Sequence, residues 1–238
     1  MSRQTRKYTY DFRGELAIAA AGSGAGGPFV KADTSAAGAP TVGGLLGGGV
    51  RLLLAATSEV ENLCLYMGDV LSFDIDEIVS VEFIAKTVAS LNAATQLAFG
   101  VCSNRNDTHD TIAEQATFRC VGSNAVVVET DDGTNDNDDV ATGLTLGATW
   151  KRFRIDFASR NTTLEPPSVS KGRKSNIEFY GANDNGSLRR VASGTRFDVS
   201  NYTGGLQLFA QLQKTADTNV NSLDILECSI EVSLPAYA

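Results

Sequence analysis

The chain has 238 residues, of which 42% are hydrophobic and 20% charged, and this is enough apolar material for one sizeable core. Its net charge of −8 and pI near 4.7 exclude a general nucleic-acid-binding protein, because phosphate contacts need an excess of Lys and Arg. No apolar run approaches the roughly 20 residues of a membrane span. We therefore expect neither nucleic acid nor a membrane as a partner.

Residues 1–49 are rich in Gly and Ala and show no sustained hydrophobic period. This composition predicts an extended N-terminal arm that cannot form a core of its own. The first part of the arm places basic side chains around aromatic rings, a combination that can order on an acidic partner surface. The predicted contact residues in this basic, aromatic tip are Arg3, Arg6, Lys7, Tyr8, Tyr10 and Arg13.

From residue 50 onward, alternating apolar and polar residues separated by turn signals predict about eleven strands. The clearest is 150–158, where Phe153, Ile155 and Phe157 share one face. The other predicted strands are 51–57, 62–67, 78–88, 95–102, 116–121, 125–129, 176–180, 188–192, 205–214 and 224–232. The pattern predicts an all-β fold over 50–238, a two-sheet antiparallel jelly-roll sandwich.

Two segments interrupt this pattern. Residues 111–115 are the only helix candidate, with Asp110 able to cap a turn. The long connection 159–175 carries a basic cluster, and long loops on compact domains are often functional. We therefore treat Lys171, Arg173 and Lys174 as a second candidate partner contact.

The four cysteines are widely spaced inside strand-like apolar runs, without a CxxC pair. We expect buried free thiols and a protein completed in a reducing cytoplasm. The start of the chain is too polar for a signal-peptide core, which agrees with this expectation. The cysteines are Cys64, Cys102, Cys120 and Cys228.

The sequence predicts no enzyme. His109 is the only histidine and lies in a polar stretch without a neighbouring nucleophile motif, so we expect it at the surface. Acid–base chemistry on a sugar would need two converging carboxylates, and nothing in the sequence brings the candidates together. These candidates are Glu82, Glu178, Glu227 and Glu231.

Calcium and sugars are the two kinds of ligand that the sequence brings into question. Residues 129–139 are dense in carboxylates, which suit calcium, but they lack the EF-hand spacing, and we expect a charged hairpin loop and no metal or other cofactor. Sugar binding would use exposed aromatic rings, but no cluster of such rings marks a platform. The available rings are Tyr66, Trp150, Tyr180 and Tyr202.

Three long segments resemble a known group of proteins: NLCLYMGDVLSFDIDEIVSVEFIAK at 62–86, AVVVETDDGTNDNDDVATGLTLGATWKRFRIDF at 125–157 and TRFDVSNYTGGLQLFAQLQKTADTNVNSLDI at 195–225. Together with the residues between them, over about 50–232, they resemble virion structural proteins of tailed bacteriophages. The resemblance implies a concanavalin-like, laminin-G-type jelly roll.

The resemblance further implies a capsid decoration or cement protein, made in the host cytoplasm and added to the capsid surface. Its partners would be the major capsid protein or other virion proteins, and such proteins commonly form homotrimers. Residues 1–49 would lie across capsid subunits or a neighbouring copy. Two alternatives stay open, a lectin-like host-recognition module and a tail or fibre component.

Overall fold

The computed structural model describes residues 4–12, 28–70, 72–157, 174–182 and 186–234. The elements that lie wholly within these ranges are β-strands, together with one 3-10 turn, η1 (His109–Thr111). The helix predicted at 111–115 is therefore wrong: the turn comes earlier, and a strand begins at Glu114. No helix among the described residues is long and apolar enough to cross a membrane.

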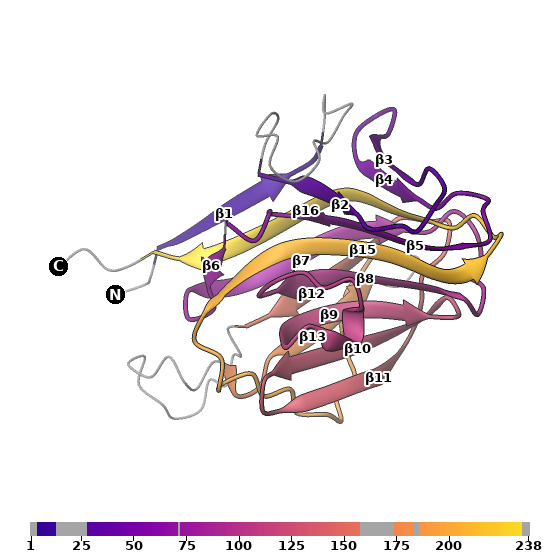
Figure 1. Ribbon diagram of the computed structural model, residues 1–238. Coiled ribbons are helices and arrows are strands. Elements are labelled where there is room, and N and C mark those ends of the chain that lie inside the picture. Colours follow the sequence, from indigo (N-terminus) through magenta and orange to yellow (C-terminus); the bar gives the residue numbers. More distant parts are fainter. Residues whose placement is uncertain (1–3, 13–27, 71, 158–173, 183–185, 235–238) are drawn as a thin grey trace.

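The strands form two antiparallel sheets of eight strands each, packed face to face (Figure 1). Sheet A has the order β14 (Leu188–Val191), β13 (Glu178–Ala182), β12 (Lys151–Asp156), β7 (Ile78–Lys86), β16 (Ser222–Ser233), β4 (Val50–Leu53) and β3 (Thr41–Gly44). β1 (Thr5–Tyr10) also pairs with β16, along its C-terminal half, whereas β4 pairs with the first residues of that strand. Sheet B has the order β11 (Asp136–Thr145), β10 (Ala125–Asp132), β9 (Glu114–Val121), β8 (Thr95–Cys102), β15 (Gly205–Asp217), β5 (Glu59–Tyr66) and β2 (Val30–Asp33), and β6 (Phe73–Asp74) pairs with β15. The predicted all-β, two-sheet antiparallel sandwich is confirmed.

Aromatic side chains fill the space between the sheets. Phe99 and Phe118 from sheet B each lie 5.0 Å, ring centre to ring centre, from Phe153 of sheet A. Phe179 meets Phe118 edge to face at 5.2 Å. All four rings are fully buried. The alternation along β12 predicted this arrangement, because every second residue of a strand points to the same side of its sheet.

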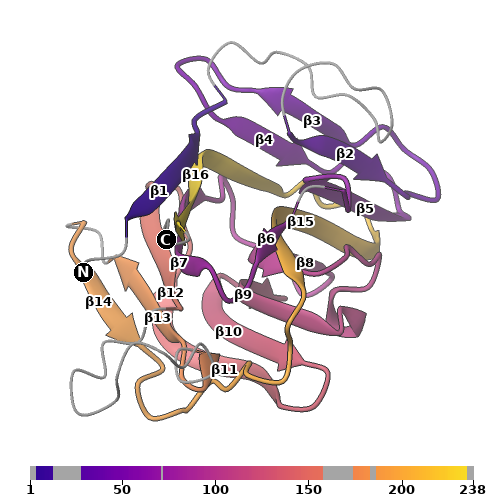
Figure 2. The ribbon, with the colours of Figure 1, turned by 90° about the vertical axis from the view of Figure 1, so that its left-hand side faces the viewer.

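The described part of residues 1–49 differs from the expected arm, because it supplies three strands of the sandwich itself. β1 pairs with β16, β2 with β5 and β3 with β4, and Figure 2 shows these segments along one side of the molecule. Phe12 and Phe29 are buried and pack against each other at 5.3 Å. Few large apolar residues suffice here because the backbone is satisfied by pairing to existing strands.

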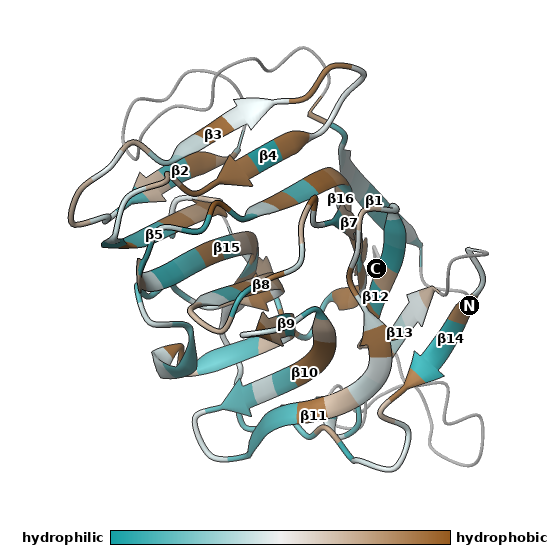
Figure 3. Ribbon diagram, turned by 90° about the vertical axis from the view of Figure 1, so that its right-hand side faces the viewer, coloured by the Kyte–Doolittle hydropathy of each residue, from teal (hydrophilic) through white to brown (hydrophobic). Residues whose placement is uncertain are grey.

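The acidic segment 129–139 also differs from expectation, since it is not simply a loop. Its residues continue β10 to Asp132 and begin β11 at Asp136, and β11 was not predicted. As the edge strand of sheet B, β11 has an exposed polar first half and buries Leu144 only near its end. Figure 3 shows hydrophilic residues where β10 and β11 adjoin. Charged residues are a common feature of edge strands.

Candidate functional site

Part of the outer face of sheet B is covered by the chain itself. Residues 103–113, here called the cover loop, run between β8 and β9 and fold back over this face. The side chains of Asn62 and Gln211 donate hydrogen bonds to main-chain carbonyls of the loop, at 2.9 Å to Asp107 and 3.0 Å to Asn106. Gln211 is consequently only 1% exposed. The part of this polar sheet face that lies under the loop is thus closed to solvent.

Gln207 fixes the start of the cover loop. Its side-chain oxygen accepts the backbone N–H groups of Met67 and Asp69, at 3.1 and 3.2 Å, and its nitrogen donates to the carbonyl of Ser103 at 3.1 Å. Asp69 in turn accepts the backbone N–H of Arg105 at 3.1 Å. These bonds tie the loop to β15 and to the end of β5.

His109 is buried under the cover loop, so the expectation of a surface histidine is wrong. The side chain is 2% exposed, and its ring stacks on Phe209 with centres 6.1 Å apart. Nε2 lies 3.5 Å from the Thr117 hydroxyl, while Nδ1 has no hydrogen-bond partner and lies 3.7 Å from Glu129 Oε2. Burial, with a smaller contribution from nearby Arg119, lowers the pKa of His109 to about 3.

Beside His109 lies a buried ionic cluster centred on Arg119. The guanidinium pairs with Glu129 and with Asp110 at 2.5 Å, and it lies 3.5 Å from Asp139. Gln115 donates a 2.6 Å hydrogen bond to the other oxygen of Glu129. Burial raises the pKa of the Glu129 carboxyl to about 7, although Arg119 opposes the shift.

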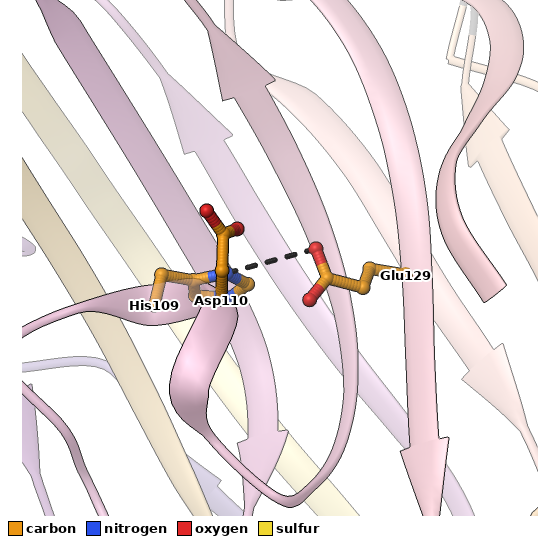
Figure 4. Close-up of side chains that lie close together, drawn as sticks. All are labelled: His109, Asp110 and Glu129. Carbon is orange, nitrogen blue, oxygen red and sulfur yellow. Dashed lines mark ion pairs between the residues drawn. The ribbon is translucent and has the colours of Figure 1, made fainter. Parts of the chain in front are cut away.

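Three members of this cluster could together hold a metal ion. His109, Asp110 and Glu129 offer ligand atoms within 4.8 Å of one another, and their side chains converge in Figure 4. However, the guanidinium of Arg119 already bridges the two carboxylates. A divalent cation would have to displace it, so we interpret the cluster as the ionic anchor that fastens the cover loop to β9 and β10.

The buried histidine predicts a specific acid response. A native pKa near 3 against a usual 6.5 means that the unfolded chain takes up the proton first as the pH falls, so folding stability declines from about pH 6.5 down to about pH 3. Chemical denaturation of the protein and His109→Gln across this range should give a difference in unfolding free energy that changes by up to about 1.4 kcal/mol per pH unit. A constant difference would mean that His109 does not titrate as the burial requires.

The carboxylates considered for sugar chemistry are engaged in ion pairs on sheet A. Glu82 accepts from Lys7 at 3.1 Å and from Arg152 at 2.8 Å. Burial would raise the pKa of Glu82, but these hydrogen bonds outweigh it and hold the pKa below its usual value. Glu178 pairs with Arg190 at 3.0 Å. An ionised, paired carboxylate is a poor proton donor, which disfavours acid catalysis at Glu82.

The other two acids lie on β16. Glu231 is opposite Ser80, whose hydroxyl donates a 3.4 Å hydrogen bond to it, and Glu227 is opposite Ile84. Neither Glu227 nor Glu231 is therefore opposite another carboxylate on β7.

Comparison with known proteins identifies the architecture. The sequence matches no protein-family model and no curated protein. Three solved structures are similar across nearly the whole chain: a Shewanella oneidensis protein of unknown function (TM-score 0.58, 11% identity, 100% of this chain and 90% of that one), peanut lectin (0.58, 10%, 98% and 100%) and a Bacillus licheniformis β-glucanase (0.56, 13%, 96% and 98%). The fold is a concanavalin-like sandwich. At such identities the likeness shows the fold alone, and it is shared by lectins and by an enzyme.

The predicted basic, aromatic tip is partly described and lies on β1. Tyr8 and Tyr10 turn their rings inward, against Phe73 at 5.5 Å and Phe29 at 5.2 Å. Arg6 is exposed and lies over the Tyr8 ring. Of the predicted contact residues on β1, the basic ones are thus the ones available to a partner. Arg3 and Arg13 lie outside the described residues.

The second predicted contact cluster is corrected at Lys174, which is 2% exposed. Its ammonium group lies 2.8 Å from a carboxylate oxygen of Asp76 and donates a 2.6 Å hydrogen bond to the carbonyl of Tyr202. A buried lysine with two such partners joins elements within the fold and is not available as a surface contact. Lys171 and Arg173 lie outside the described residues.

The aromatic rings considered for sugar stacking are dispersed. Tyr66 is buried, and the hydroxyl of Tyr202 donates to the carbonyl of Gly205 at 2.9 Å. Tyr180 donates to Glu178 at 2.5 Å. Trp150 is 36% exposed, with the ammonium of Lys86 4.4 Å from its ring centre. These rings do not form a common stacking platform.

The four cysteines are buried free thiols, as predicted.

Proposed function

We propose that this chain is a non-catalytic structural protein of a bacteriophage particle, a capsid decoration protein that binds and stabilises the assembled shell. The proposal includes assembly as a homotrimer on the capsid surface after synthesis in the host cytoplasm. It is supported by the resemblance of whole strands and turns to virion proteins, and by a sheet face that is partly occupied by its own cover loop. The observation that carries it is the open edge of β1.

One edge of β1 is available for a partner strand. The N–H of Leu234 donates to the carbonyl of Gln4 at 2.8 Å, and Thr5 is opposite Ser233. In an antiparallel ladder, bonded and non-bonded pairs alternate, so the backbone groups of Thr5, Lys7 and Thr9 point away from β16. Among the described residues no strand pairs with that edge.

The side chains of this edge favour an acidic partner. β1 contains Arg6 and Lys7 and no acidic residue. An acidic segment of a shell protein could therefore add to sheet A as a further strand, with backbone hydrogen bonds supplying affinity and charge supplying selectivity. A protein that binds only the assembled shell stabilises it by mass action.

This proposal predicts that Thr9→Pro weakens shell binding at least tenfold while preserving the fold. Proline removes an N–H that points away from β16 and obstructs strand addition at the edge. Purified protein is incubated with undecorated capsids, and bound copies are counted after sedimentation. We expect saturable binding that weakens at least tenfold in Thr9→Pro and in Arg6→Glu.

The matched control is Arg189→Glu, which makes the same charge change at an exposed position of β14, an edge strand of sheet A away from β1. Its binding should equal that of the unaltered protein. Equal binding by Thr9→Pro would remove the edge from the mechanism, and absence of any saturable binding would contradict the decoration role itself.

A second candidate function is carbohydrate binding, as in a host-recognition module. It is favoured by the fold, since this chain is similar both to peanut lectin and to the carbohydrate recognition domain of Emp47p (TM-score 0.54, 11% identity, 93% of this chain and 96% of that one). A glycan array separates the two candidates, because a decoration protein binds capsids and is indifferent to sugars.

A further inference from the structure

We infer that a polar groove beside the β10–β11 turn is a binding site for an acidic oligosaccharide. The groove consists of two adjoining clefts, of about 470 and 420 Å³, which share Arg196. One half is lined by amide and carboxylate side chains and the other by arginine and hydroxyl side chains. The inference rests on the second candidate function, and it is independent of the capsid proposal.

Asp132 holds the two walls of the groove together. Its Oδ1 accepts the backbone N–H groups of Thr134 and Asn135, at 3.0 and 2.6 Å, which fixes the β10–β11 turn. Its Oδ2 accepts the backbone N–H of Asn201 at 3.0 Å, from the segment that forms the other wall. One buried carboxylate thereby fixes both walls, and a preformed site loses less entropy when a ligand binds.

The basic half has unused donors. Arg196 uses Nε for the carbonyl of Ser175 at 2.7 Å and Nη2 for Asp198 at 3.1 Å, and Nη1 makes no hydrogen bond within the described structure. Arg190 pairs with Glu178 through Nη1 only. The hydroxyls of Ser193 and Thr195 line the same cleft. Guanidinium and hydroxyl donors of this kind suit a carboxylate oxygen.

The other half offers the groups that recognise sugar hydroxyls. Asn135 and Asn137 each use one amide hydrogen within the turn, for Asp132 and Thr130, and keep a second amide hydrogen and a carbonyl oxygen for a ligand. The carboxylates of Asp136 and Asp198 have lone pairs that can accept from hydroxyls. Apart from Gly194, every residue that lines the two clefts has a polar or charged side chain. A peptide partner is generally held by apolar or aromatic anchors, which this lining does not provide. Hydroxyl groups on one side and a carboxylate on the other are the features of a uronate- or sialate-containing glycan.

The test is a glycan array of uronate-, sialate- and neutral-sugar oligosaccharides, probed with the full chain. We expect binding to acidic members only, weaker at high salt because the contacts are ionic. Arg196→Gln and Asp136→Ala should each reduce binding of the best acidic glycan about tenfold or more, whereas Arg152→Gln, which removes an equal charge from sheet A, should not.

The other outcomes overturn the inference in distinguishable ways. Binding to neutral glycans only would remove the groove site and leave the carbohydrate candidate, whereas binding to no glycan would remove both and leave the capsid proposal standing. Acidic-glycan binding that survives both groove variants would place the sugar elsewhere on the chain. Equal competition by inorganic sulfate or by an acidic peptide would show a simple anion site without sugar recognition.

Discussion

Arg119→Met should lower the free energy of unfolding by about 3–5 kcal/mol, because removing one partner of a buried ion pair leaves an uncompensated buried charge. The side chain is 3% exposed and contacts Glu129, Asp110 and Asp139. The loss should be larger at pH 8 than at pH 5.5. Without Arg119 the already raised pKa of Glu129 rises further, so burying this carboxyl costs more free energy at pH 8, whereas at pH 5.5 the carboxyl is neutral with or without Arg119.

Chemical denaturation at both pH values measures this effect. Arg152→Met is the matched control, because Arg152 is about half exposed and its removal should cost about 1 kcal/mol or less. Adding Glu129→Leu to Arg119→Met should recover part of the stability, since no buried charge is then left unpaired. A small, pH-independent loss in Arg119→Met would mean that the cluster does not anchor the cover loop.

Gly100→Ala should destabilise the protein by about 3 kcal/mol or more, because backbone, which cannot move aside cheaply, occupies the space of the new methyl group. Gly100 pairs with Thr117 across β8 and β9, and an added Cβ would lie 2.9 Å from the Thr117 Cα and still closer to the carbonyl oxygen of Ala116. Thermal unfolding compares this variant with Gly147→Ala, where the added atom meets nothing within 4 Å. Similar melting temperatures for the two variants would contradict the predicted close approach of β8 and β9.

The sandwich could be predicted because its core strands alternate strictly. In β12, Phe153 and Ile155 are buried at every second position, and this follows from the strand geometry alone. β11 was not predicted because the first half of this edge strand is acidic and exposed, a composition that is also typical of loops. The strands within residues 1–49 escaped prediction for a different reason. β3 contains two glycines and a single valine, so its order comes from pairing with β4 and not from its own side chains.

The candidate site was harder to predict, because burial there is produced by contacts between distant segments. The polar residues around His109 resemble a solvated loop, and nothing local reveals that they cover Phe209. A partial signal existed in β15, where Gln207 and Gln211 stand at positions expected to face water. Amide side chains can satisfy both donors and acceptors of a covering backbone, whereas Lys and Glu cannot. Glutamines along one face of a strand therefore indicate a face covered by other backbone and not one exposed to solvent.

The most direct test of the proposed role is whether purified bacteriophage virions contain this chain, and in how many copies, measured by quantitative mass spectrometry against the major capsid protein. A capsid decoration protein predicts a fixed, high ratio, with many copies per shell. A few copies per particle would indicate a tail or fibre component, and absence from the particle would contradict the structural role.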